Sequence, residues 1–422
     1  MSFTAWIALA VIFITVWALV KQFETRLVLI AAGLFLCVIS LAPMTGLNQF
    51  AKSMTNNALI MAICGSMGFA YTASYMGCDR SLVHYLASPV RGLGIFLIPV
   101  CTIITFFVNI ALPSAAGCAA AVGSTLIPVM LRAGIKPAAA APAVLAGTIG
   151  SYLSPGTSHN PFVAKMAHMD VMDFIGTHAT YSVMCGAILV VGTLIVCWIL
   201  GDNKGDVNAK IDESKLQKDD DFKPNVLKAV VMIVPIAILV SGSVWFPSIK
   251  MGVAQAMLIG AICCLLTGRC DLQRFSKEFF NGMGKGYANV MGIIIAAGVF
   301  AAGLRAAGLI DVCVDALKES NEYARWGGSL GPWIMGVITG SGDAATLAFN
   351  EAVTPHAESF GMTIPSLGGL AFLTGALGRT MSPLAGVTIL VSGIAMVNPL
   401  EVVKRTAIPC FIAVIACAIL MV

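Results

Sequence analysis

Apolar segments of membrane-crossing length follow one another along almost the whole chain of 422 residues. A helix needs about 20 apolar residues to cross a bilayer, and a helix satisfies its own backbone groups there. A soluble globule carries about 25% charged residues, whereas this chain has 11% charged and 58% hydrophobic residues. We therefore predict an all-α polytopic membrane protein. Helices are expected near 3–20, 26–43, 58–77, 94–112, 117–131, 137–153, 161–169, 175–200, 227–246, 251–268, 287–304, 326–339, 344–358, 365–380, 386–396 and 399–421.

The remaining composition excludes several other classes of protein. The net charge is only +4, and the basic residues lie in the short joints between apolar runs, which argues against a nucleic-acid partner. The 13 cysteines show no CxxC or Cys/His spacing, so no metal site and no cofactor are expected. No HExxH motif is present, and we do not expect an enzyme. The first run, Phe3 to Val20, lacks a basic leading segment and a cleavage site, and we interpret it as a retained span.

One arginine interrupts an otherwise apolar stretch, the run from Leu367 to Val397. Arg379 lies within Gly-Arg-Thr-Met-Ser-Pro, and an arginine at mid-membrane depth costs about 3 kcal/mol or more by insertion scales. Such a residue persists mainly where it faces a cavity and binds an anion. Ser382 followed by Pro383 is typical of a helix start, so we expect two half-helices that meet at this break.

The two halves of the chain, on either side of the hydrophilic stretch 201–226, repeat the same order of apolar runs. With an offset of 228 positions, Gly150 falls on Gly378 and Ser154-Pro155 falls on Ser382-Pro383. We therefore predict an internal duplication with a hydrophilic cytoplasmic linker. The first repeat is 1–200 (scaffold 1–92, hairpin and broken helix 93–174, last span 175–200), the linker is 201–226, and the second repeat is 227–422 (scaffold 227–320, hairpin and broken helix 321–397, last span 398–422).

The basic residues predict how the two repeats are oriented. If the N-terminus is outside and each repeat contains one re-entrant hairpin, eighteen lysines and arginines lie in inner joints and five in outer joints, as the positive-inside rule requires. Each repeat then crosses five times, so the second repeat is inverted and both termini lie outside. Inverted repeats with interrupted spans are the sequence signature of secondary transporters, whose substrate lies at the repeat interface.

Four polar clusters fall at matching places in the two halves, at two hairpin tips and two helix breaks. Small hydroxyls and free amides at helix starts bind carboxylates, and unwound carbonyls can coordinate a cation. The predicted substrate-binding residues are Ser114 (first tip), Ser154, Thr157, Ser158, His159 and Asn160 (first break), Gly340 and Ser341 (second tip), and Arg379, Thr380 and Ser382 (second break). The residues predicted for ion coupling are Asp343, Ser341 and Asn160.

Several of these residues have simpler alternative roles. Arg379 could be held by carbonyl groups for structure alone, Asp343 could be an N-cap, and His159 could be a hydrogen-bonded loop residue. Lys165 is expected to extend its amine to solvent from the second half-helix. The titratable residues at the outer end of the second hairpin are expected to be solvated; they are Glu351, His356 and Glu358.

At these clusters the chain resembles the DcuC family of anaerobic four-carbon dicarboxylate carriers, within the ion transporter superfamily. The similarity covers most of the chain. It is strongest over 378–387, Asn398 to Thr406 and Thr339 to Gly342, and weaker over Ser114 to Gly134 and around 297–300.

The resemblance implies a bacterial inner-membrane homodimer, surrounded by lipid, that exchanges or takes up succinate, fumarate and malate by an elevator movement. In that arrangement the hairpins and broken helices form the moving transport domain. Arg379 would hold one carboxylate and the Ser114, Ser154 and Ser341 tips the other, with sodium and protons both open as coupling ions. The alternatives are a carrier for a tricarboxylate or an acidic amino acid, and an uncoupled anion channel.

Overall fold

A computed structural model describes residues 3–21, 23–87, 94–202, 223–246, 248, 251–310, 312 and 321–421. Every regular element within these residues is helical. Most of the predicted linker, residues 203–222, lies outside the described residues, as do 88–93 and 313–320 at the ends of the two predicted scaffold segments. The prediction of an all-helical chain is therefore confirmed for the described part.

The helices of the first half follow the predicted order, with two additions. They are α1 (Phe3–Val20), α2 (Thr25–Ile39), α3 (Pro43–Met54), α4 (Asn57–Tyr75), α5 (Cys78–Ala87), η2 (Gly94–Phe96), α6 (Leu97–Ala111), α7 (Ala115–Arg132), α8 (Pro137–Gly147), η3 (Gly150–Leu153), α9 (His159–Met166) and α10 (Val171–Ile199). The additions are α3 and α5, which the sequence did not predict because neither is a continuous apolar run.

The second half has a similar order of elements. They are α11 (Val226–Val231), α12 (Val234–Val244), α13 (Val253–Leu266), α14 (Leu272–Lys285), the π-helical segment η5 (Gly286–Met291), α15 (Gly292–Ala306), α17 (Asn321–Thr339), α18 (Gly342–Ala352), η6 (Thr354–Phe360), α19 (Ile364–Thr380), α20 (Gly386–Ala395) and α21 (Pro399–Leu420). The predicted span 287–304 proved too short, because α14 continues through η5 into α15 as one helical run.

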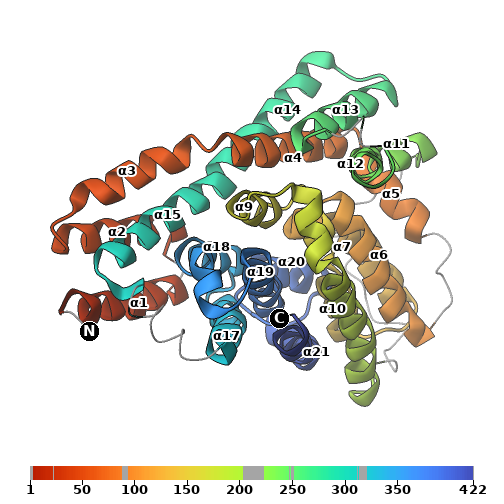
Figure 1. Cartoon of the computed structure of the whole chain (residues 1–422). Helices are drawn as coiled ribbons and strands as arrows, with labels where there is room; N and C mark the ends of the chain where they lie inside the picture. Colours follow the sequence, from red (N-terminus) through yellow and green to blue (C-terminus); the bar gives the residue numbers. More distant parts are fainter. Residues whose placement is uncertain are drawn as a thin grey trace.

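Two long helical arms lie across the bundle of hairpins and broken helices (Figure 1). One arm is α3 with α4, bent by 48°, and the other is the 35-residue run from α14 to α15. Within this layer α14 and α13 pack on α4, while α3 and α2 pack on α15. Each half of the chain thus contributes one arm, and each arm packs on helices from the opposite half.

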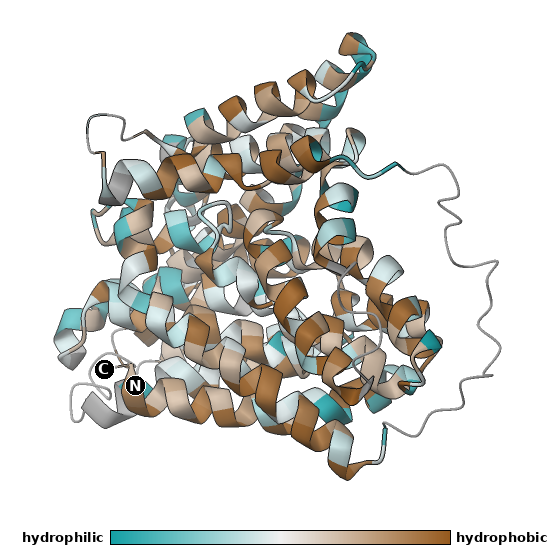
Figure 2. Cartoon of the chain, turned by 90° about the vertical axis from the view of Figure 1, so that its right-hand side faces the viewer, coloured by the Kyte–Doolittle hydropathy of each residue, from teal (hydrophilic) through white to brown (hydrophobic). Residues whose placement is uncertain are grey.

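In the described part of the chain, four helices are long and apolar enough to cross a membrane, or five if the bent pair α3–α4 is one span. The four are Ala115–Arg132, Val171–Ile199, Leu272–Ala306 and Pro399–Leu420. Figure 2 shows hydrophobic residues along most helices, with hydrophilic residues gathered mainly near helix ends. Length and apolar surface together fit a multi-pass membrane protein.

Two helical hairpins and two broken helices form the centre of the bundle. The hairpins are α6–α7 and α17–α18, and their second helices begin directly after the N-caps Ser114 and Ser341. A serine oxygen at such a position accepts a hydrogen bond from an otherwise unpaired N–H of the first turn. Ser114 Oγ accepts from Gly117 N at 3.2 Å, and Ser341 Oγ accepts from Ala344 N at 3.4 Å.

The two broken helices are interrupted close to the gaps between the predicted apolar runs, at 154–158 and 381–385. The half-helix expected to start at Ser382 and Pro383 begins instead at Gly386, because Ser382 Oγ accepts from Leu384 N in a local turn. The matching half-helix α9 likewise begins at His159, beyond Ser154 and Pro155. Both Ser-Pro pairs therefore lie in the loops. The prediction of a helix start at Ser382 and Pro383 was wrong, whereas the predicted run 386–396 agrees with α20.

A buried ion pair joins the last helices of the two halves. Arg405 in α21 donates to both carboxylate oxygens of Asp202, directly after α10, at 2.7 and 3.0 Å, and it donates to Glu401 at 2.9 Å. The side chains of Arg405 and Asp202 are 7% and 1% exposed. The carbonyl oxygen of Asp202 also accepts from the backbone N–H of Lys136, at the start of α8. Three segments far apart in the sequence are held at one point.

We predict that Asp202→Ala destabilises the folded protein by about 3–5 kcal/mol, because it leaves the Arg405 charge buried without its main partner. Glu401→Gln is the control, since the Glu401 side chain is half exposed and contributes about 1 kcal/mol or less. Thermal unfolding of the detergent-purified variants is the measurement. Equal melting temperatures for both variants would show that this pair does not stabilise the fold.

Candidate functional site

His159, the first residue of α9, lies buried where the two halves of the chain meet. Its ring stacks on Phe372 of α19, with the ring centroids 4.5 Å apart and the planes 7° apart. Its Nδ1 is 3.9 Å from Oδ1 of Asp343, in the first turn of α18. The side chain is only 1% exposed, and its Nε2 is buried without a hydrogen-bond partner.

Hydrogen bonds hold the first break in one conformation. Asn160 Nδ2 donates to the carbonyl oxygens of Tyr152 and Ser154, both at 2.8 Å. Asn160 Oδ1 lies 3.2 Å from Nε2 of His178 in α10, whose Nδ1 lies 3.0 Å from Ser182 Oγ. The polar groups of Asn160 are thus occupied within the protein, which favours a structural role for it beside the predicted binding role.

A second set of bonds ties this break to its neighbours. Thr157 Oγ1 donates to the carbonyl oxygen of Ser151 at 2.6 Å, and the N–H of Ser151 donates to Oδ1 of Asn109 in α6 at 2.7 Å. Ser158 Oγ lies 3.4 Å from His159 Nδ1. A Cβ added to Gly156 would lie 3.1 Å from Pro113, so the first tip and the first break are close neighbours. The predicted residues of these two clusters are therefore brought together.

Arg379 lies in the last turn of α19, beside the end of α8. Its Nη2 is 3.3 Å from Oγ1 of Thr148 and 3.5 Å from the carbonyl oxygen of Thr148. These contacts are long, and Nε of Arg379 is buried without a partner. Arg379 is also within electrostatic range of Tyr152 and His159. The Arg379 guanidinium is therefore held by long contacts at Nη2, and its Nε–H group has no acceptor.

The neighbours of Arg379 in the second break are bonded within the protein. Thr380 Oγ1 donates to the carbonyl oxygen of Ala376 at 2.9 Å, and its own carbonyl oxygen accepts from Thr406 Oγ1 at 3.0 Å. Ser382 is fully buried in its local turn. Thr380 Oγ1 and Ser382 Oγ thus each take part in a hydrogen bond, whereas Nε of Arg379 takes part in none.

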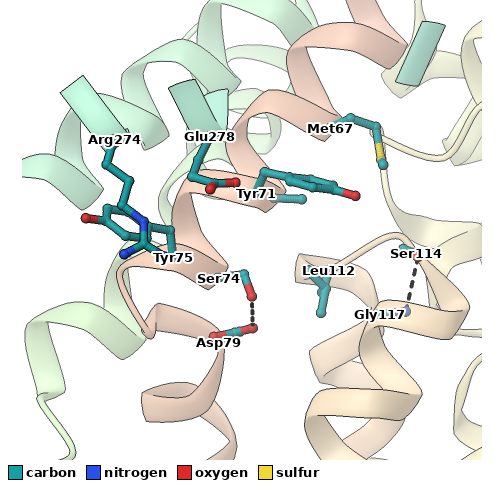
Figure 3. A pocket seen from close by; sticks show the side chains of 11 residues that line it. Met67, Tyr71, Ser74, Tyr75, Asp79, Leu112, Ser114, Gly117, Arg274 and Glu278 are labelled. Carbon is teal, nitrogen blue, oxygen red and sulfur yellow. Dashed lines mark hydrogen bonds between the residues drawn. The ribbon is translucent and has the colours of Figure 1, made fainter. Parts of the chain in front are cut away.

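The first tip borders a large cavity. Ser114 and Gly117 line a space of about 550 Å³ together with α4, α5 and α14. On its far wall the guanidinium of Arg274 lies 5.1 Å from the ring centre of Tyr75, and Ser74 Oγ donates to Asp79 at 2.9 Å (Figure 3). This cavity carries one arginine against two carboxylates, those of Asp79 and Glu278.

The second tip borders a smaller space. Gly340 and Ser341 line about 150 Å³ with Leu19 at the end of α1 and Leu384 of the second break. Gly340 has a φ of +70°, and a Cβ there would lie 2.7 Å from the backbone carbonyl carbon of Leu384. Glycine is required at this position because the chain is both left-handed and in close contact. The second tip and the second break are therefore also neighbours.

Asp343 is not the N-cap of α18, because Ser341 occupies that position. The Asp343 side chain is 64% exposed and faces the His159 ring. It is therefore accessible to a cation or a proton.

Sequence reasoning missed three residues that shape this site. Thr148 contacts Arg379, Phe372 stacks on His159, and His178 orients Asn160. A histidine inside the apolar run 175–200 was a visible signal. Thr148 and Phe372 carried none, because they are ordinary residues of an apolar helix until the fold brings them to the site.

Comparison with known proteins identifies the family. A family model described as DcuC, the C4-dicarboxylate anaerobic carrier, matches residues 40–422. An uncharacterized transporter of Haemophilus influenzae is 46% identical over 279 residues, which is 64% of this chain and 99% of that protein. The anaerobic C4-dicarboxylate transporter DcuC of Escherichia coli K12 is 27% identical over 374 residues, which is 85% of this chain and 78% of that protein.

One solved structure has a similar fold. The YdaH transporter of Alcanivorax borkumensis aligns with a TM-score of 0.55 at 15% identity, covering 89% of this chain and 86% of that one. The predictions of a polytopic membrane transporter, of no enzymatic activity and of a DcuC resemblance are confirmed. The chain belongs to the DcuC family of C4-dicarboxylate anaerobic carriers.

Proposed function

We propose that this protein is a secondary transporter of small dicarboxylates such as succinate, fumarate and malate. One observation carries the proposal: Nε of Arg379 and Nε2 of His159 are both buried without partners where the two broken helices meet. A buried polar group without a partner costs about 1–3 kcal/mol, and more if it is charged. A bound carboxylate would supply the missing acceptor, and the family supports a dianion with four carbons.

The chemistry of the site supports a carboxylate as the ligand. A guanidinium binds a carboxylate through two parallel hydrogen bonds, which an ammonium cannot reproduce. Ser114 and Ser341, at the starts of α7 and α18, offer free amides of the kind that bind anions at helix starts. In this proposal Arg379 holds one carboxylate and the tips hold the other.

The packing supports two inverted repeats within the chain. Helices α2 and α3 pack on α15 of the second half, and α13 and α14 pack on α4 of the first half. Each half also has a hairpin with a serine cap, followed by a broken helix. Such repeats place the substrate at their interface. We further propose that the hairpins and broken helices move against the arms in an elevator movement, within a homodimer of the bacterial inner membrane.

Arg379→Lys should insert and fold but transport poorly, because lysine keeps the charge and loses the two-point contact. Arg379→Ala should lose high-affinity succinate binding. Wild-type protein should prefer succinate over its monoamide, and this preference should collapse in the lysine variant. Uptake into proteoliposomes and equilibrium binding are the measurements, with Arg269→Lys, at an exposed loop residue, as the control. Near-normal affinity in Arg379→Ala would make the arginine structural.

Asp343→Asn should change how uptake depends on sodium or pH, while exchange of substrate continues. Two negative charges about 5 Å apart repel by roughly 3 kcal/mol at an effective dielectric constant of about 20, so an acid beside a dianion calls for a cation or proton. The measurement is uptake over a series of sodium concentrations and pH values. Unchanged ion dependence at a normal rate would assign Asp343 to structure only.

A cysteine introduced within 206–220 should react with a membrane-impermeant maleimide only from the cytoplasmic side, and one at Glu319 only from outside. Both positions lie outside the described residues and follow from the distribution of basic residues. Both cysteines are introduced into a chain whose native cysteines are replaced by alanine, because Cys263 and Cys270 are only half buried. Labelling of both positions from the same side would exclude the inverted topology.

A further inference from the structure

A basic cavity lies beside the central site. It encloses about 290 Å³, close to the lower end of small-molecule sites, which is about 300 Å³. Lys52, Lys165 and Arg305 line it with a single carboxylate, that of Glu351. Lys52 and Arg305 were interpreted from the sequence as topology signals, and Glu351 was expected to be solvated. The structure corrects the last expectation, because Glu351 is partly buried and lines this cavity.

The three cations come from different parts of the chain. Lys52 is in the last turn of α3, Lys165 in the last turn of α9 and Arg305 in the last turn of α15. A basic residue in a last turn offsets the helix dipole by itself. The helix dipole explains a basic residue at each of the three helix ends. It does not explain why three helix ends from both halves line one cavity.

Among the described residues that line this cavity, one carboxylate stands against three cations, so the positive charge is only partly offset. Lys165 Nζ donates to Asn56 Oδ1, and Glu351 Oε1 accepts from Gln49 Nε2 at 3.4 Å. In the described part of the chain none of the three cations forms an ion pair. Three positive side chains around one carboxylate repel one another unless an anion joins them.

The cavity and the central site lie at opposite ends of the same pair of helices. Helix α9 begins at His159 and carries Lys165 six residues later, while α18 carries Asp343 in its first turn and Glu351 eight residues later. The two helices pack together. At about 1.5 Å per residue, these positions are separated by about 9 and 12 Å along the helices. The cavity therefore lies about 9 Å along α9 from His159 of the central site.

We propose that this cavity is an antechamber that binds a small organic dianion before it reaches the central site. The proposal rests on the function proposed above. It also assigns different roles to the two large cavities, because the one beside Ser114 carries one arginine against two carboxylates. Substrate is captured through the positive cavity on one face of the membrane, and the other face has no comparable attraction for an anion.

The test compares uptake of radiolabelled succinate from each face, in cells and in inside-out vesicles. The triple variant Lys52→Gln, Lys165→Gln, Arg305→Gln should raise the KM about tenfold from one face only, with the maximal rate retained, because a cleft of one sign of charge raises association rates by about 10- to 1,000-fold. The difference in KM between the wild type and the triple variant should become smaller in high salt. Glu351→Gln should lower the KM from the same face, because it removes the one negative charge and keeps an acceptor for Gln49.

Two controls separate charge from folding. The double variant Lys52→Arg, Lys165→Arg keeps the charge and should keep the wild-type KM. Lys277→Gln removes an exposed lysine of α14 that does not line the cavity, and it should leave the KM unchanged from both faces. An unchanged KM and salt dependence in the triple variant, or an equal change from both faces, would overturn the antechamber. Failure of the proposed function would give a different result from failure of the antechamber, because Arg379→Ala would then retain normal succinate affinity.

Discussion

The structure depends on how a broken helix satisfies its backbone and polar groups inside a membrane. The hydrocarbon core offers no water, so each interrupted segment needs internal partners. In the first break these partners are side chains: Asn160 bonds two carbonyl oxygens, Thr157 bonds a third and Asn109 accepts from Ser151. The break is thereby held open in one conformation, at the place where the two halves meet.

In the proposed function, the polar groups that keep no partner after this internal bonding bind the substrate. The histidine at the start of α9 and the arginine at the end of α19 each keep one buried nitrogen without a partner. The arginine is also positioned only by long contacts with Thr148. A site whose loop is fixed by hydrogen bonds and whose central nitrogens have no partner is suited to reversible binding of a ligand, because its donors are arranged before the ligand binds.

Sequence reasoning identified the class, the order of most helices and the polar clusters, because long apolar runs and buried charges are local signals. It failed where the outcome depended on packing. The Ser382-Pro383 pair predicted as a helix start lies in a turn, because Ser382 Oγ accepts a hydrogen bond from Leu384 N. The amphipathic parts of the arms, such as α14, were missed because they are not continuous apolar runs. Their apolar faces become buried only when they pack on the opposite arm. Phe372 and Thr148 became site residues only through the fold.

The central claim is that the unused nitrogens of Arg379 and His159 receive a substrate carboxylate. An electron cryo-microscopy map of the purified protein in saturating succinate tests it most directly, compared with a map in a chloride buffer without succinate. The account predicts succinate-dependent density between the Arg379 guanidinium and the His159 ring. Density at another place in the bundle, with none at these two side chains, would contradict it.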